Sequence, residues 1–311
     1  MTNNAPQEAR GAILVSPGSA NLYDNGLPSM TVVKDDLSEA DYQRYDTANK
    51  TLDSILVTNL FTYYVEAARS LITQWQEASN MFAAALPITG LTDEVAKTAT
   101  RLRGGVLNAV SMLCYHQERT LDEVCDKYGH NSEQHVQVKR IFNALYDNYF
   151  GYRYLYKLRN IMVHDTMEAV SMTSKAYRNN GEPFANVDLD IYRPTFLASP
   201  KVGATLKAEL ASKPGDPSVL QMMMEIGRPL VKANSKLLTI LHPDLTSVCD
   251  AVVDFDNLYE GKEGTKGLIH QLSPQLKAPF ITGFTPWSES VLRFAHYYTT
   301  AEWNGNDDDE E

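Results

Sequence analysis

Hydrophobic positions recur every three or four residues along most of the first half of the chain, which is the period of a helix with one buried face. This spacing runs from residue 38 to about residue 75, and it resumes near residue 92. Asn131 or Ser132 is a suitable N-cap for a third stretch, which continues to about His164. The pattern therefore predicts long helices that bury apolar faces against one another.

Two local signals refine the second of these stretches. Thr120-Leu-Asp-Glu123 has the form of a capping box, and Gly129 is a typical residue just beyond a helix end. Together they predict a separate short helix over 120–128. The Gly104-Gly105 pair upstream should weaken its helix or let another backbone come close.

The period changes after His164. Apolar residues alternate with polar ones over 170–176 and again over 187–191, on either side of Arg178-Asn-Asn-Gly181. Two period-two runs around an Asn/Gly turn predict a β-hairpin. Helical spacing returns after residue 216 and continues in segments to about residue 298.

These elements predict a mainly α protein. We expect an irregular N-terminal arm over 1–36, an antiparallel helical bundle with a β-hairpin over 37–200, and a mainly helical C-terminal region over 201–306. An acidic tail occupies 307–311.

Composition excludes several classes of protein. The 311 residues are 43% hydrophobic and 22% charged, which is typical of globular proteins. No apolar run approaches the roughly 20 residues that cross a bilayer, and the first ten residues lack the order of a secretory signal. The three cysteines form no disulfide framework or zinc-finger spacing. The sequence therefore predicts a soluble, cytoplasmic protein.

The net charge of −11 conceals a basic segment. Between residues 134 and 180 there are seven Lys or Arg residues and only three Asp or Glu residues. A locally basic segment on an acidic chain is a candidate for contact with a polyanion such as nucleic acid.

The strongest chemical signal is Arg159-Asn160-Ile-Met-Val-His164 at the end of the third helical stretch. Asn160 and His164 are four residues apart and so share a helix face, and the long side chain of Arg159 can reach the same side. Three residues on the preceding turns extend this stripe as candidate RNA contacts: Arg153, Tyr156 and Lys157. Of the five tyrosines between 146 and 156, only Tyr156 is expected on this face.

These residue types suit phosphodiester chemistry. An imidazole with an ordinary pKa near ~6.5 can move a proton at neutral pH, and a guanidinium can hold two phosphate oxygens. Asn160 can orient either partner. No acidic cluster indicates a magnesium site, and His116, His130 and His135 share neither a helix face nor a Cys partner. We therefore expect neither a metal nor another cofactor.

The Arg159-Asn160-x-x-x-His164 sequence resembles the RNxxxH motif of HEPN-domain ribonucleases, and the resemblance covers roughly residues 38–170. Chains of this composition contain the pattern by chance in about 2% of cases. The resemblance implies a HEPN-like bundle and a homodimer in which two motifs face one cleft. It implies an endoribonuclease that cuts RNA without a metal, with Arg159, Asn160 and His164 as catalytic residues. It also implies a role in prokaryotic antiviral defence, abortive infection or toxin systems.

Two other classes of function stay open. The chain could be a non-catalytic module that binds RNA or a nucleotide, or a structural or regulatory protein that docks a partner. An inhibitor or sensor partner could bind through the C-terminal half, whose role the sequence does not identify.

Overall fold

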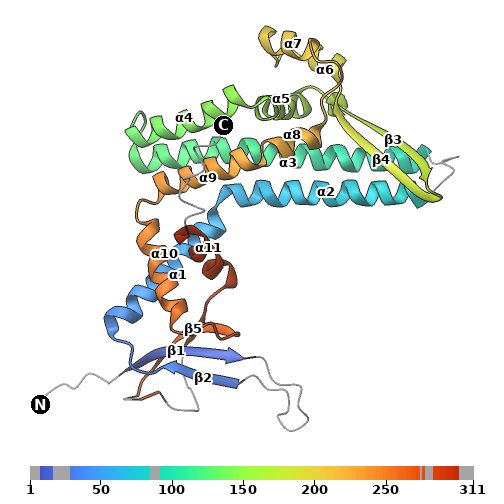
Figure 1. The fold of residues 1–311 in the computed structure, drawn as a ribbon. Coiled ribbons are helices and arrows are strands. Elements are labelled where there is room, and N and C mark those ends of the chain that lie inside the picture. Colours follow the sequence, from blue (N-terminus) through green and yellow to red (C-terminus); the bar gives the residue numbers. More distant parts are fainter. Residues whose placement is uncertain (1–7, 17–28, 85–91, 274, 277–282, 301–311) are drawn as a thin grey trace, which may run out of the picture. The chain divides into compact units, whose positions relative to one another are not determined.

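A computed structural model describes residues 8–16, 29–84, 92–273, 275–276 and 283–300. These residues are mainly helical, as expected from the sequence, and they include two small antiparallel sheets (Figure 1). No helix in the described segments is long and apolar enough to span a membrane. The predicted acidic tail, 307–311, lies outside the described residues.

The chain divides into two compact units. One spans Asn59–Leu241, and the other combines the segments up to Thr58 and from His242 onward. This division differs from the predicted boundaries at 36 and 200, because the first segment of the chain pairs with the last. The boundary predicted at 306 lies outside the described residues. The Arg/Asn/His motif lies in the unit from Asn59 to Leu241.

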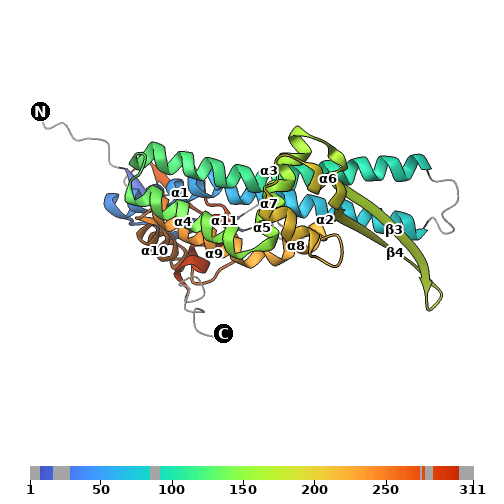
Figure 2. The same cartoon turned by 90° about the horizontal axis from the view of Figure 1, so that it is seen from above.

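Two long helices pack against each other in that unit. Helices α2 (Leu60–Ala84) and α3 (Thr92–Tyr128) lie side by side (Figures 1 and 2). Gly105 permits a close approach, because a Cβ there would meet Leu71 Cδ1 and Gln74 Oε1 at 3.0 Å. The close neighbours at Gly105 are side-chain atoms of α2, and a Cβ at Gly104 would meet nothing within 4 Å, so a close approach of another backbone at the glycine pair stays a prediction.

Helix α3 is continuous through the predicted capping box, so a separate helix over 120–128 was wrong. Thr120 is buried in the middle of α3 rather than capping a new helix. Val124, one turn further along, belongs to the hydrophobic core. Burial of this face outweighs the local capping signal. The predicted helix end is confirmed, since Gly129 follows α3 with φ +91°.

Helices α4 (Glu133–Asn148) and α5 (Phe150–His164) replace the single helix predicted up to His164. Ser132 caps α4 as expected, with its hydroxyl accepting the backbone N–H of His135. Tyr149 adopts an extended conformation between the two helices.

Gly151, in the first turn of α5, lies against helix α8 (Val219–Glu225). A Cβ at Gly151 would lie 2.8 Å from the carbonyl oxygen of Met222. Helix α9 (Gly227–Leu241) follows α8 and packs along α4. Helix α8 thus packs against α5, and α9 packs against α4.

The predicted hairpin is confirmed. A short 3-10 turn leads from α5 into β3 (Val170–Asn179), which pairs with β4 (Glu182–Ile191) in an antiparallel register. Asn180 and Gly181 both have positive φ, 51° and 88°, as a two-residue hairpin turn of this type requires. Trp75 Nε1 of α2 donates to the Val187 carbonyl and fixes β4 on that helix.

Two short helices complete this unit. Helices α6 (Arg193–Ala198) and α7 (Ala204–Ala211) follow the hairpin. Phe196 and Leu210 are fully buried and join these helices to the core.

The other unit contains a four-stranded antiparallel sheet in the order β2-β1-β5-β6. Its strands are β1 (Ala9–Ser16), β2 (Ser29–Lys34), β5 (Thr265–Gln271) and β6 (Phe284–Pro286). Its helices are α1 (Glu39–Thr58), α10 (Leu245–Asn257) and α11 (Glu289–Thr299).

The irregular arm predicted over 1–36 was therefore wrong, since β1 and β2 lie within it. Strand β1 pairs with β5, about 250 residues later, so its partner is far outside any local sequence window. The helical spacing read from 38 to 75 also belongs to two helices. Helix α1 ends at Thr58 and α2 begins at Leu60, with Asn59 Oδ1 accepting the N–H of Phe61 at 3.1 Å.

Candidate active site

Helix α5 has one buried face and one polar stripe. Its core face is made of six residues: Tyr152, Tyr154, Leu155, Leu158, Ile161 and Met162. Arg153, Lys157, Asn160 and His164 follow one another at steps of four, three and four residues, which places them along one stripe of the helix. Four of the six predicted site residues therefore share one surface of the helix.

Arg159 and Asn160 are brought into contact. Arg159 Nη1 donates to Asn160 Oδ1 at 3.2 Å, and both side chains are half-buried. Arg159 Nε is enclosed and has no hydrogen-bond partner in the described part of the chain. None of the ion pairs among the described residues involves Arg159. Its guanidinium is therefore positioned by Asn160.

His164 is the last residue of α5 and is exposed. It lies one helical turn beyond Asn160 on the same stripe, without a contact to the Arg159–Asn160 pair. The imidazole is accessible for proton transfer.

Ser199, a residue outside the motif, forms a hydrogen bond at the end of α5. Asp165, which follows His164, donates its backbone N–H to the Ile161 carbonyl and caps the helix. Ser199 is buried, and its hydroxyl donates to Asp165 Oδ2 at 2.5 Å. The segment after α6 thus fixes the turn that carries His164.

Tyr156 and Lys157 lie together with a residue from the preceding helix. The Tyr146 and Tyr156 rings meet edge to face with centroids 6.4 Å apart, and Lys157 Nζ is 6.0 Å from each centroid. Burial, followed by the nearby Cys114 and Glu118, raises the pKa of Tyr156. Tyr146 therefore belongs to this surface, although the sequence pattern assigned only Tyr156 to it.

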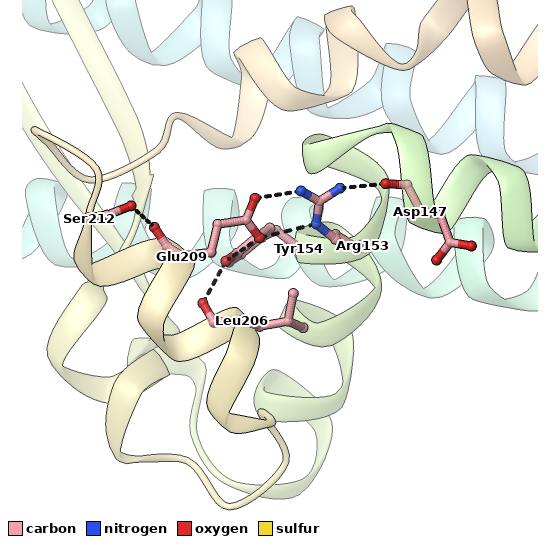
Figure 3. A network of polar contacts seen from close by, with 6 residues as sticks. All are labelled: Asp147, Arg153, Tyr154, Leu206, Glu209 and Ser212. Carbon is pink, nitrogen blue, oxygen red and sulfur yellow. Dashed lines mark hydrogen bonds and ion pairs between the residues drawn. The ribbon is translucent and has the colours of Figure 1, made fainter.

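Arg153 differs from the other candidates because it is already paired. Figure 3 shows its guanidinium facing Glu209 of α7. Its Nη2 and Nε donate to the two carboxylate oxygens at 2.5 and 3.2 Å, and Nη1 donates to the Asp147 carbonyl at 3.3 Å. In this arrangement Arg153 contacts an internal anion.

The neighbouring thiol is inert. Cys114 of α3 is fully buried near Arg159, and burial raises the pKa of its thiol to about 12. A thiol in that state is not a nucleophile at neutral pH.

The chain matches no protein-family model, no curated protein and no solved structure. The chemical interpretation of the site therefore depends on its own residues and geometry.

A Cys/His contact occurs elsewhere in the same unit. Cys125 Sγ lies 3.6 Å from His130 Nδ1, and the His130 and His135 rings are 4.9 Å apart. The expectation that these histidines lack a Cys neighbour was thus wrong. Within the described segments, however, no group of three or more His, Cys, Asp or Glu residues is arranged to hold a metal ion.

Sequence reasoning missed Ser199, Glu209 and Tyr146. The first two reach α5 from 34 and 56 residues away, and no local pattern marks such contacts. Tyr146 lies in the preceding helix, α4. Because the helix is interrupted at Tyr149, the direction of the Tyr146 side chain does not follow from a single continuous helix.

Proposed function

We propose that this chain is a HEPN-like endoribonuclease that cleaves RNA without a metal, with Arg159, Asn160 and His164 as its catalytic residues. The observation that supports it is the Arg159–Asn160 contact. Asn160, which lies one turn from the exposed imidazole, positions a guanidinium that has no carboxylate partner among the described residues. An arginine held in this way is suited to an anion from outside the chain.

Each group has a defined role in this reaction. The ribose 2′-hydroxyl loses its proton to a base, and its oxygen attacks the adjacent phosphorus. The bond from phosphorus to the 5′-oxygen breaks, and that oxygen takes up a proton. The products carry a 2′,3′-cyclic phosphate and a 5′-hydroxyl. His164 serves as general base or general acid, since one imidazole can perform either transfer.

Arg159 stabilises the charge that develops on the phosphate oxygens in the transition state. Asn160 orients the guanidinium through the hydrogen bond to Nη1. Lys157 and the Tyr146–Tyr156 pair extend the site along the strand, with a cation for phosphate and aromatic rings for unpaired bases.

A homodimer completes the site in this proposal. One imidazole supplies one proton-transfer group, whereas the reaction uses a base and an acid. A two-fold pair of α5 stripes would supply both. The resemblance of the motif further favours a defence or toxin role in a prokaryotic cell.

A cleavage assay with a matched histidine control tests the proposal. His130 is exposed in the same unit but is distant in sequence from the motif, so His130→Ala controls for the loss of a surface histidine. Wild type and His130→Ala should cut a labelled RNA in EDTA, and His164→Ala should be at least a hundredfold slower.

Equal cleavage by His164→Ala would contradict the assignment. Binding of RNA by every variant without cleavage would instead support the non-catalytic RNA-binding alternative.

A further inference from the structure

Arg153 is the first cation of the polar stripe on α5, and it forms an ion pair with an acidic side chain of the same chain. Arg153 is separated from His164 by three helical turns on one face. Glu209 of α7 accepts from both Nε and Nη2 of Arg153, and only 17% of the arginine side chain is exposed. Figure 3 shows the carboxylate aligned with the edge of the guanidinium.

This contact has the geometry with which arginine binds phosphate. Two parallel N–H donors of a guanidinium meet two oxygens of one anion in either case. The Glu209 carboxylate therefore stands where two oxygens of an RNA phosphate would stand. Because it is tethered to the chain, it competes with the phosphate at a high effective concentration.

The charges around the pair keep Glu209 anionic. The hydrogen bonds from Arg153 lower the pKa of the Glu209 carboxyl, and Tyr154 and Lys213 act in the same direction. Lys213 Nζ lies 4.4 Å from the centroid of Phe150, which also faces the Arg153 guanidinium.

We propose that Glu209 masks Arg153 from RNA and thereby lowers the affinity of the α5 stripe for its RNA substrate. The inference rests on the proposed function. In the masked state RNA is held by Lys157 and the motif, and Arg153 adds a phosphate contact only when Glu209 is displaced.

Other contacts hold α7 in place independently of this ion pair. Tyr154 donates its hydroxyl to the Leu206 carbonyl at 2.6 Å, and Leu210 is fully buried. Removing the charge of Glu209 should therefore free Arg153 while α7 stays docked. This separates masking from a purely structural role of the pair.

The test measures binding of a labelled, unstructured RNA to the full chain over a range of salt concentrations. The variants are Glu209→Gln, Arg153→Gln and the double variant. Asp216→Asn is the matched control, because Asp216 also pairs with an arginine, Arg193, that lies outside α5. Melting temperatures are recorded for each protein.

Glu209→Gln should bind RNA roughly tenfold more tightly at low salt, the gain expected from one added charge-assisted hydrogen bond. Its plot of log affinity against log salt should steepen by about 0.7, the value for one additional phosphate contact on a single strand. Asp216→Asn should bind like wild type. The double variant should lose the gain.

An unchanged affinity and salt slope in Glu209→Gln, with RNA cleavage that still depends on His164, would overturn the masking and leave the proposed function intact. Absence of salt-dependent RNA binding and of cleavage in all proteins would overturn both.

Discussion

Ser199, at the end of α6, donates its hydroxyl hydrogen to Asp165, the residue directly after His164. The oxygen atoms are 2.5 Å apart, and the Ser199 hydroxyl also accepts the backbone N–H of Lys201 at 3.1 Å. The contact joins a segment 34 residues away to the turn that carries the imidazole. The Asp165 carboxylate is thereby directed toward Ser199.

Ser199→Ala should slow cleavage about tenfold with little change in RNA affinity, because a small displacement of a catalytic group affects the transition state more than binding. Asp165→Asn should retain most of the activity, since its amide oxygen still accepts the hydrogen bond. Single-turnover rates and binding curves separate the two quantities. Ser235→Ala, which removes a hydroxyl from α9, is the control. Equal losses of rate and affinity would indicate a general structural defect instead.

Asn160→Ala should lower the cleavage rate by at least tenfold, because Arg159 loses the acceptor that orients its guanidinium. Arg159→Lys should be impaired more strongly, since an ammonium cannot hold two oxygens in a fixed plane. The measurement is the single-turnover rate for each variant. A fully active Asn160→Ala would show that the contact has no role in catalysis.

Protonation of His116 at low pH should destabilise the unit that spans Asn59–Leu241. This side chain is 2% exposed between Phe61 and Phe142, and burial lowers the pKa of its imidazole to about 4. The unfolded state has an ordinary pKa of ~6.5 and binds the proton more readily, so stability falls as the pH decreases from ~6.5 toward ~4. The full loss is roughly 3 kcal/mol.

Urea denaturation at pH 7 and pH 4 measures this effect. Fluorescence of Trp75 reports on the unit when Trp287 and Trp303 are replaced by Phe. His116→Gln should remove most of the pH dependence, whereas the exposed-site control His130→Gln should keep it. Identical pH profiles for wild type and His116→Gln would refute the assignment.

Two glycines should respond to alanine with opposite signs. Gly151→Ala should destabilise the unit by about 1–3 kcal/mol, because its Cβ would lie 2.8 Å from the Met222 carbonyl oxygen. Gly104→Ala should stabilise α3 by about 0.5–1 kcal/mol, since its Cβ would meet nothing within 4 Å. The same denaturation assay measures both. A neutral Gly151→Ala would mean that α8 can move away from α5 without cost.

Signals that act within a few residues were predictable from the sequence. Ser132 caps α4, Gly129 follows α3, and Asn180-Gly181 forms the hairpin turn. In each case the side chain or backbone preference of one or two residues decides the local geometry.

Features decided by distant contacts were not predictable in this way. Strand β1 depends on its pairing with β5, and the capping box at Thr120 is overridden by burial of that face of α3. The motif residues were found because their spacing is local. The partners Glu209 and Ser199, which determine what Arg153 and Asp165 contact, approach from elsewhere in the fold.

Identification of the RNA product ends tests the central proposal most directly. Purified wild type and His164→Ala are incubated with labelled RNA in EDTA, and the ends of each fragment are determined. Wild type should leave 2′,3′-cyclic phosphate and 5′-hydroxyl ends, and His164→Ala should leave the RNA intact. Fragments with 5′-phosphate ends, or the same fragments from both proteins, would contradict the proposed mechanism.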